Sequence, residues 1–307
     1  MSRIAPWTAL ALAAFAAPLV GCNTSTEGEN SLVRFTYEDP VVTFGASLDT
    51  AIAVGTRATL DVQSLDATAG IRVRGAKIEP PEIAEVVGNE INTLVIEGLT
   101  AGEATLTVDT DRGTDLGTIR VAEATQVGVS AIIETEKVFI GGTELLTIER
   151  RDAVGQLLVG VAPAELTIAP DTAAERVPGG DDHEFRLRYL EAGGKTLQVG
   201  DTQLPREVVT VDQVAEFEFA EQLEGATLAV GGELPGLVQV KDAGGQPIGA
   251  VEGVMTVQSL TPEVCTVRFQ RQLYLPGVQV EGVSAGECTI EGALGAETVQ
   301  LSLTVEG

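Results

Sequence analysis

Ala101-Gly102-Glu103-Ala104-Thr105-Leu106 is the first of three related hexapeptides in this sequence of 307 residues. The other two are Ala192-Gly193-Gly194-Lys195-Thr196-Leu197 and Ala285-Gly286-Glu287-Cys288-Thr289-Ile290, at spacings of 91 and 93 residues. Further markers recur with nearly the same step, namely Val54-Gly55-Thr56, Ile140-Gly141-Gly142 and Val230-Gly231-Gly232, together with Arg151-Asp152-Ala153 and Lys241-Asp242-Ala243. Several markers in register indicate three copies of one structural unit.

The residue pattern within each unit predicts β-strands. Apolar and polar residues alternate, as at Val299, Leu301, Leu303 and Val305, and glycine-rich turns separate such runs. No segment after the N-terminus shows a sustained helical stripe. Several short strands in a unit of roughly 90 residues fit an antiparallel sandwich. We therefore expect an all-β chain with domains at 32–123, 124–212 and 213–307.

Longer blocks of the unit identify the type of sandwich. Unit 1 contains Pro81-Glu82-Ile83-Ala84-Glu85-Val86 and the stretch 98–106, and unit 3 repeats them at 262–267 and 282–290. These blocks resemble the bacterial immunoglobulin-like repeats of intimin, of invasin-type adhesins and of many cell-surface proteins. The resemblance implies three tandem immunoglobulin-like β-sandwiches. Unit 2 is the divergent copy, because Lys195 stands where the others have Ala or Cys.

The N-terminus predicts export and attachment to lipid. Arg3 precedes an apolar run at 9–17, which is typical of a signal peptide and too short for a membrane span. Leu19-Val20-Gly21-Cys22 resembles the lipobox of bacterial lipoproteins, which implies cleavage after residue 21 and acylation of Cys22. In that family, Asn23 favours sorting to the outer membrane. Residues 22–31 are expected to form the lipidated Cys and a flexible tether.

Charge and aromatic content argue against several kinds of partner. Loss of residues 1–21 removes one base and no acid, so the net charge changes from −26 to −27. Such a surface repels nucleic acid and anionic headgroups. Trp7 is the only Trp and leaves with the signal peptide, which disfavours a sugar-stacking platform. We expect a membrane contact through the lipid anchor, a protein or other envelope component as partner, and no nucleic acid or small-molecule substrate.

Cys265 and Cys288 fit the alignment of the units. They occupy the positions of Ala84 and Ala104 in unit 1, and joint replacement of two small residues suggests that they are neighbours. In an oxidising compartment, with Cys22 committed to lipid, these two remain to form a disulfide. The alternative is a pair of buried thiols.

Two sequence features that suggest an enzyme are better explained as a turn and a polar loop. Gly282-Val283-Ser284-Ala285-Gly286 matches the nucleophile elbow of α/β-hydrolases, but strand residues follow it and no His lies downstream. Its counterpart at 98–102 has Thr in place of Ser, so we expect a turn. The only His, His183, lies in a polar loop and cannot by itself build the usual zinc site.

Acidic residues offer one candidate metal site. Asp109, Asp111 and Asp115 surround a glycine, and closely spaced carboxylates are typical calcium ligands. The cluster lacks the terminal Glu of an EF-hand loop and contains Arg112. A hairpin turn between two strands is the alternative explanation. Apart from this calcium candidate, we expect no cofactor.

The sequence thus predicts a non-enzymatic cell-envelope lipoprotein whose domains form a surface stalk or an adhesion module. One alternative is a specific binding module for an envelope protein, with calcium dependence if the acidic cluster binds the ion. A more remote alternative is a hydrolase that uses carboxylates, which would require a deep pocket with convergent acids.

Overall fold

The computed structural model describes residues 26–39, 42–66, 70–131, 135–220, 223–270 and 275–307. Within these ranges the chain consists of strands and connecting turns, with one short 3-10 helix at Val211–Gln213. None of its described helices has the length and apolar character needed to cross a bilayer. The predicted all-β fold is confirmed.

The first sandwich packs two sheets against each other. One sheet has the order β1-β2-β5-β8-β7, with β3 paired to β2, and the other has the order β4-β10-β9-β6. Its strands are β1 (Thr26–Glu27), β2 (Val33–Asp39), β3 (Val42–Ala46), β4 (Ile52–Ala53), β5 (Arg57–Ser64), β6 (Val73–Glu79), β7 (Ala84–Asn89), β8 (Thr93–Gly98), β9 (Gly102–Thr110) and β10 (Gly113–Ala122).

The second sandwich repeats this arrangement. Its sheets have the orders β11-β13-β17-β16 and β15-β18-β19-β12, with β14 added to β13 and β23 of the next unit added beside β12. Its strands are β11 (Gln126–Ala131), β12 (Lys137–Phe139), β13 (Thr143–Arg151), β14 (Leu157–Leu158), β15 (Ile168–Ala169), β16 (Ala174–Arg176), β17 (Glu184–Tyr189), β18 (Gly193–Val199) and β19 (Thr202–Val209).

The third sandwich contains the same two sheets, β20-β22-β26-β25 and β21-β28-β27-β24. Its strands are β20 (Val214–Phe219), β21 (Thr227–Ala229), β22 (Glu233–Asp242), β23 (Ile248–Gly249), β24 (Met255–Ser259), β25 (Cys265–Phe269), β26 (Gly277–Gly282), β27 (Gly286–Leu294) and β28 (Glu297–Glu306). In all three units the strands follow immunoglobulin order, A-B-E-D on one sheet and A′-G-F-C on the other. Each unit is an immunoglobulin-like sandwich.

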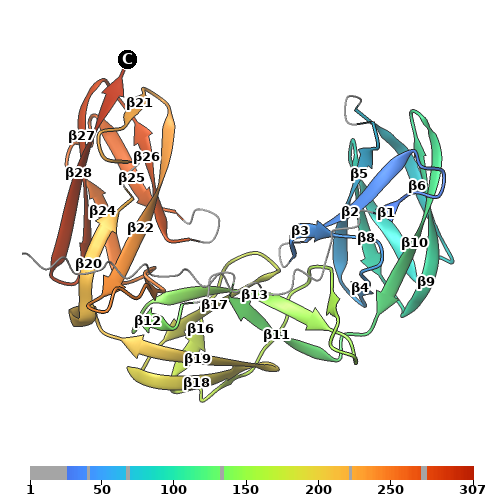
Figure 1. Cartoon of the computed structure of the whole chain (residues 1–307), viewed down its shortest axis with the longest axis horizontal. Helices are drawn as coiled ribbons and strands as arrows, with labels where there is room; N and C mark the ends of the chain where they lie inside the picture. Colours follow the sequence, from blue (N-terminus) through green and yellow to red (C-terminus); the bar gives the residue numbers. More distant parts are fainter. Residues whose placement is uncertain (1–25, 40–41, 67–69, 132–134, 221–222, 271–274) are drawn as a thin grey trace, which may run out of the picture.

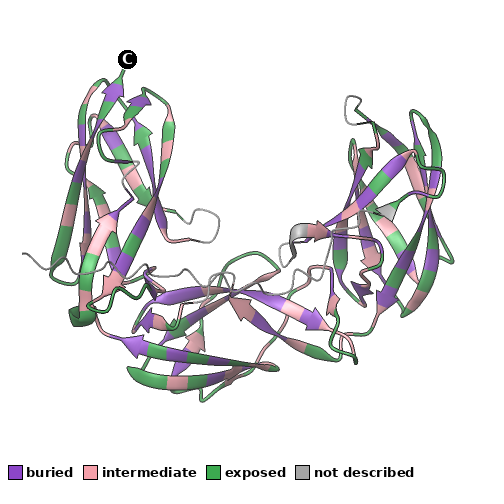
Figure 2. Ribbon diagram, in the orientation of Figure 1, coloured by how far each residue is buried: buried purple, intermediate pink, exposed green. Residues whose placement is uncertain are grey.

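The alternation read from the sequence reflects burial between the sheets. In β28, Leu301, Leu303 and Val305 are buried, and the residues between them are exposed or half-buried. Figure 2 shows the same alternation along many strands. The buried side chains form three clusters, one centred in each sandwich. The sandwiches follow one another along a curved array, with the outer two on the same side of the second (Figure 1).

The N-terminal segment differs from the predicted tether of residues 22–31. Residues 22–25 lie outside the described residues, but β1 pairs with β2, where Thr26 lies opposite Phe35. Gly28 is buried and lies next to the carboxylate of Asp115. A Cβ added to Gly28 would lie 2.2 Å from the carboxyl carbon of Asp115. From Thr26 onward the prediction of a flexible tether is therefore wrong, because strand pairing and Asp115 hold this segment on the first sandwich.

A buried polar cluster explains how the second unit diverges. Glu144 and Arg206 form an ion pair of 2.9 Å between side chains that are 8% and 7% exposed, and the Tyr189 hydroxyl donates to Glu144. By strand register, the third sandwich has Leu234 in place of Glu144 and Leu303 in place of Arg206. Gly282 takes the place of Tyr189. Burial disfavours the charged guanidinium, but the hydrogen bond and charge of Glu144 outweigh it and raise the pKa of Arg206.

Candidate functional site: the two junctions between sandwiches

The first junction joins the A′ strand of the first sandwich to the B–C segment of the second. The amide of Ala53 donates to the carbonyl of Val159 at 2.9 Å, and the amide of Val159 donates to Ala51 at 3.0 Å. Arg57 and Val161 exchange two further backbone bonds of 3.1 and 2.8 Å. Val159 is fully buried and belongs to the core of the first sandwich. This edge of the first sandwich is therefore completed by its neighbour.

The second junction repeats this construction one unit later. β23, in the B–C segment of the third sandwich, pairs in parallel with β12, the A′ strand of the second. The amide of Thr143 donates to the carbonyl of Glu252 at 2.8 Å, as Arg57 does to Val161. Phe139 is fully buried and belongs to the core of the third sandwich. At each junction, a residue of the second sandwich thus belongs to the hydrophobic core of its neighbour.

The same turn presents both B–C segments. Asp152 Oδ1 accepts the amides of Val154 and Gln156 at 2.9 and 2.8 Å. Asp242 Oδ1 accepts the amides of Gly244 and Gln246, both at 2.8 Å. An Asp side chain that caps its own turn in this way fixes the loop locally. In the sequence, Asp152 and Asp242 appear only as repeat markers. The B–C segments that follow them pair with the preceding sandwich, and this contact is not visible within one unit.

At one matched position, each junction pairs a glycine of one sandwich with a larger residue of the other. At the first, a Cβ on Gly160 would lie 2.0 Å from the Thr56 hydroxyl, so the residue facing Thr56 must be glycine. At the second, Gly142 replaces Thr, and a Cβ on it would lie 1.9 Å from the carbonyl of Ala250. Gly160 and Ala250 both have positive φ, 115° and 56°. Each B–C segment therefore fits the unit that precedes it.

Charged side chains reinforce the second junction. Lys137 Nζ lies 2.7 Å from Asp242 Oδ2 and 3.4 Å from Glu207, and Arg186 is paired with Glu252. The hydrogen bond from Lys137 lowers the pKa of Asp242, and the same bond raises the pKa of Lys137. Lys137 belongs to the second sandwich and Asp242 to the third, so the pair joins the two units.

At the first junction, buried groups of opposite charge face each other. Asp39 and Arg150 are 9% and 7% exposed. Asp39 accepts the amide of Gly160 at 2.8 Å, and Arg150 donates to the carbonyl of Ala162 at 2.5 Å. Burial lowers the pKa of Arg150, and the charge of Asp39 opposes that effect.

Each junction also borders a hollow. One of about 540 Å³ lies at the first junction, and its lining includes Asp49, Glu103, Arg120 and Gln156. The other, of about 250 Å³, lies at the second junction between Glu184, Arg186 and Glu252. These hollows combine residues of two sandwiches, so their shape depends on how the sandwiches dock.

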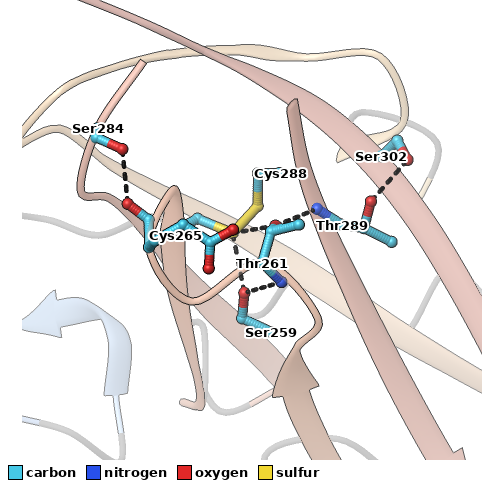
Figure 3. The surroundings of a disulfide bond; sticks show 8 residues. Ser259, Thr261, Cys265, Ser284, Cys288, Thr289 and Ser302 are labelled. Atoms are coloured by element: carbon cyan, nitrogen blue, oxygen red, sulfur yellow. Dashed lines mark hydrogen bonds between the residues drawn. A yellow bond between two sulfur atoms is a disulfide. The ribbon is translucent and has the colours of Figure 1, made fainter. Parts of the chain in front are cut away.

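The predicted disulfide between Cys265 and Cys288 is present. It joins β25 in one sheet to β27 in the other, with both residues fully buried and a Cα–Cα distance of 5.7 Å. Figure 3 shows its surroundings, where the amide of Thr289 donates to the Thr261 hydroxyl at 2.9 Å. Ala84 and Ala104 occupy the equivalent positions in the first sandwich and are also buried. The bond therefore replaces two small core residues with a link between the sheets.

Asp115 has a structural role in the first sandwich. Its carboxylate is fully buried and accepts the amides of Asn30, Leu32 and Val33 at 2.8, 2.9 and 3.1 Å, and that of Leu116 at 2.9 Å. A buried carboxylate needs such partners. Four amides occupy its oxygens, and three of them anchor the N-terminal segment.

The other two calcium candidates lie apart from Asp115 on the β9–β10 hairpin. Asp109 is exposed and accepts the Thr114 hydroxyl, while Asp111 lies in the turn and accepts the Arg72 amide. Asp109 and Asp115 differ in burial because they point to opposite faces of the sheet. The structure does not bring the three carboxylates together, and the turn provides the arrangement expected of a hairpin.

The remaining candidates lie on the surface. Ser284 donates to the carbonyl of Glu263 at 2.6 Å in a turn, and β27 rather than a helix follows it. The ligand atoms of Asp181, His183 and Glu184 lie within 4.8 Å of one another, the only such group of three among the described residues. Asp181 is exposed and the other two are half-buried, as expected for a polar loop. Cys22 lies outside the described residues.

Comparisons with known proteins identify structural similarities only. No family model and no curated protein sequence matches the chain. Domains 4 and 5 of the S-layer protein SbsC share 16% identity over 59% of this chain and 99% of that one, with a TM-score of 0.28. The Escherichia coli adhesin FdeC matches at 15% identity over 84% and 95% of the two chains, with a TM-score of 0.27. Invasin, a bacterial integrin-binding protein, matches at 16% over 84% and 58%, with a TM-score of 0.25.

Proposed function

We propose that the chain is a non-enzymatic, lipid-anchored protein of the cell envelope, in which three sandwiches form a spacer with a surface for adhesion or interaction. The observation that carries this proposal is the repeated junction. Backbone bridges, shared core residues and paired charges fix each sandwich against the next, which favours an array that holds its far end at a defined position. A passive connection between domains would not need these contacts.

The charge of the array supports an interaction with proteins or cations rather than with phosphate-rich partners. Acidic residues outnumber basic ones by 45 to 19 over the chain. This excess repels nucleic acid and anionic lipid surfaces. The membrane contact in the proposal therefore depends on the lipid at Cys22 and on no polybasic surface.

Replacing Cys22 with Ala tests the anchor. We expect the Cys22→Ala protein to leave the membrane fraction, because acyl chains contribute about 0.8 kcal/mol per buried CH₂ and nothing else in the proposal holds the chain there. Fractionation and metabolic labelling with palmitate provide the measurement. The disulfide variant Cys265→Ala/Cys288→Ala serves as a matched control, since it changes cysteines and should remain labelled and membrane-bound. A Cys22→Ala protein that stayed with the membrane would contradict the anchor.

Crosslinking on intact cells tests the interaction role. A photoreactive residue placed at exposed apolar positions in different sandwiches, such as Val154, Val230 and Val283, should capture envelope components. Capture of one partner in stoichiometric yield by a single position would establish a specific binding module. Absence of any captured component at every position would contradict the interaction role and leave the spacer.

A further inference from the structure

The A′ strand of the third sandwich, β21, has an open side. It pairs in parallel with β28, and no other strand lies beside it among the residues that the structure describes. The A′ strands of the other two sandwiches have partners on both sides. β4 lies between β10 and the Val159 segment, and β12 lies between β19 and β23.

Burial reflects this difference at equivalent positions. Ala53 in the first sandwich and Phe139 in the second are fully buried under the adjoining unit. Ala229, their counterpart in the third, is exposed, and the adjacent Val230 is 46% exposed. The outer side of the A′ strand is thus covered in the first two sandwiches and exposed in the third.

The open edge keeps the backbone geometry of the two occupied edges. The glycine that follows each A′ strand has nearly the same φ, 73° at Gly55, 74° at Gly141 and 75° at Gly231. Each of these glycines donates its amide to the end of strand E, at 2.7 to 2.8 Å. The third edge is therefore formed in the same shape without a neighbour.

Gly232 indicates which kind of segment fits this edge. At Gly142 the position of a Cβ is filled by the carbonyl of Ala250 from the next unit. At Gly232, which follows β21, the three atoms nearest to a Cβ belong to Leu228 and Ala229 of that strand, the closest at 3.0 Å. Its φ does not require glycine, and Thr56 shows that a side chain is accepted at this position. The space over Gly232 corresponds to the space that Ala250 fills at the second junction.

We propose that β21 is a docking edge for the B–C segment of a further immunoglobulin-like domain, which carries an Asp-x-x-Gly-Gln turn followed by apolar residues. The inference names the partner class for the interaction role proposed above and rests on that role. Both segments of this type in the present chain, after Asp152 and after Asp242, are engaged within it, so the occupant is not one of these two. The Ala229 amide would donate as Ala53 does, and the Thr227 carbonyl would accept as Ala51 does.

The test uses residues 23–307, which lack the signal peptide and the lipidated Cys22, and a cyclised peptide that copies residues 241–253. We expect saturable binding at millimolar peptide, with amide chemical-shift changes confined to residues 227–233. Ala229→Pro removes the outward amide and should weaken binding by about tenfold or more, which corresponds to 1.4 kcal/mol. Leu260→Ala alters an exposed apolar residue elsewhere and should leave binding unchanged.

A second pair of probes keeps the test decisive if Ala229→Pro perturbs the fold. Gly232→Thr introduces the residue that the first sandwich tolerates at this position, and it should abolish binding of the 241–253 peptide. A peptide that copies residues 151–162 contains Gly160, which faces Thr56 in the first junction, and should bind Gly232→Thr better than it binds the parent. No saturable binding of either peptide, or equal binding to parent and Gly232→Thr, would overturn the proposal. Neither outcome depends on membrane attachment or on cell-surface capture, so failure here is distinct from failure of the proposed function.

Discussion

Glu144→Leu is expected to lower the free energy of unfolding of the second sandwich by about 3–5 kcal/mol. The substitution leaves Arg206 charged and buried without its carboxylate, and removing one partner of a buried ion pair has a cost of this size. Tyr189 also loses the acceptor of its hydroxyl. Hydrogen exchange of β13 and β17, followed through denaturant unfolding, measures the second sandwich separately from the others.

The triple variant Glu144→Leu/Tyr189→Phe/Arg206→Leu should recover most of that loss. It removes every polar member of the cluster and introduces the leucines that the third sandwich has at the matching positions, Leu234 and Leu303. Replacing a whole buried ion pair by apolar residues of similar volume is often neutral or stabilising. Glu103→Leu is the control, because its pair with Arg120 is exposed and contributes less than about 1 kcal/mol. A triple variant no more stable than Glu144→Leu would contradict this account.

Cys265→Ala/Cys288→Ala should destabilise the third sandwich by about 3 kcal/mol, because the unfolded chain regains the freedom that the cross-link removes. For a domain of this size, the loss corresponds to a fall in Tm of roughly 12–24 °C. The variant should still fold, since Ala84 and Ala104 fill the same positions in the first sandwich. Calorimetry with thiol labelling of the parent is the measurement. Two labelled thiols in the native parent would remove the basis of the prediction.

The reverse exchange tests the equivalence of the units. Ala84→Cys/Ala104→Cys should form a second disulfide on oxidation and stabilise the first sandwich by a similar amount, with mass mapping as the readout. Ala84→Ser/Ala104→Ser provides a control that changes the same residues without a cross-link. Failure to oxidise would show that the first sandwich holds these positions farther apart than the third does.

The sequence predicted the features that depend on position within a unit. Alternating residues such as Leu301 and Leu303 give buried strand faces, and the joint change of Ala84 and Ala104 to cysteine identified the disulfide. The turn around Ser284 followed from its counterpart at 98–102. Each of these features depends on neighbouring residues or recurs at the same position in another unit. Comparison of the units was therefore sufficient to predict them.

Features that depend on contacts between units or on folding of the N-terminus were not predicted. The capped turns at Asp152 and Asp242 appear in the sequence as markers, but their contacts with the preceding sandwich are visible only in three dimensions. Asp115 is a calcium candidate in the sequence because Asp109 and Asp111 are close to it, whereas three of its four amide partners lie more than 80 residues away. Lys195 marked the second unit as divergent without indicating the buried pair of Glu144 and Arg206.

The disulfide limits how far the array can lengthen when it is pulled. A stretched chain gains at most about 3.3–3.6 Å per residue, and the cross-link encloses a sequence separation of 23 residues. An unravelled third sandwich is therefore roughly 80 Å shorter than it would be with free thiols, whereas the first two have no such restraint among their described residues. Under tension, the third sandwich therefore releases less chain length than it would without the cross-link.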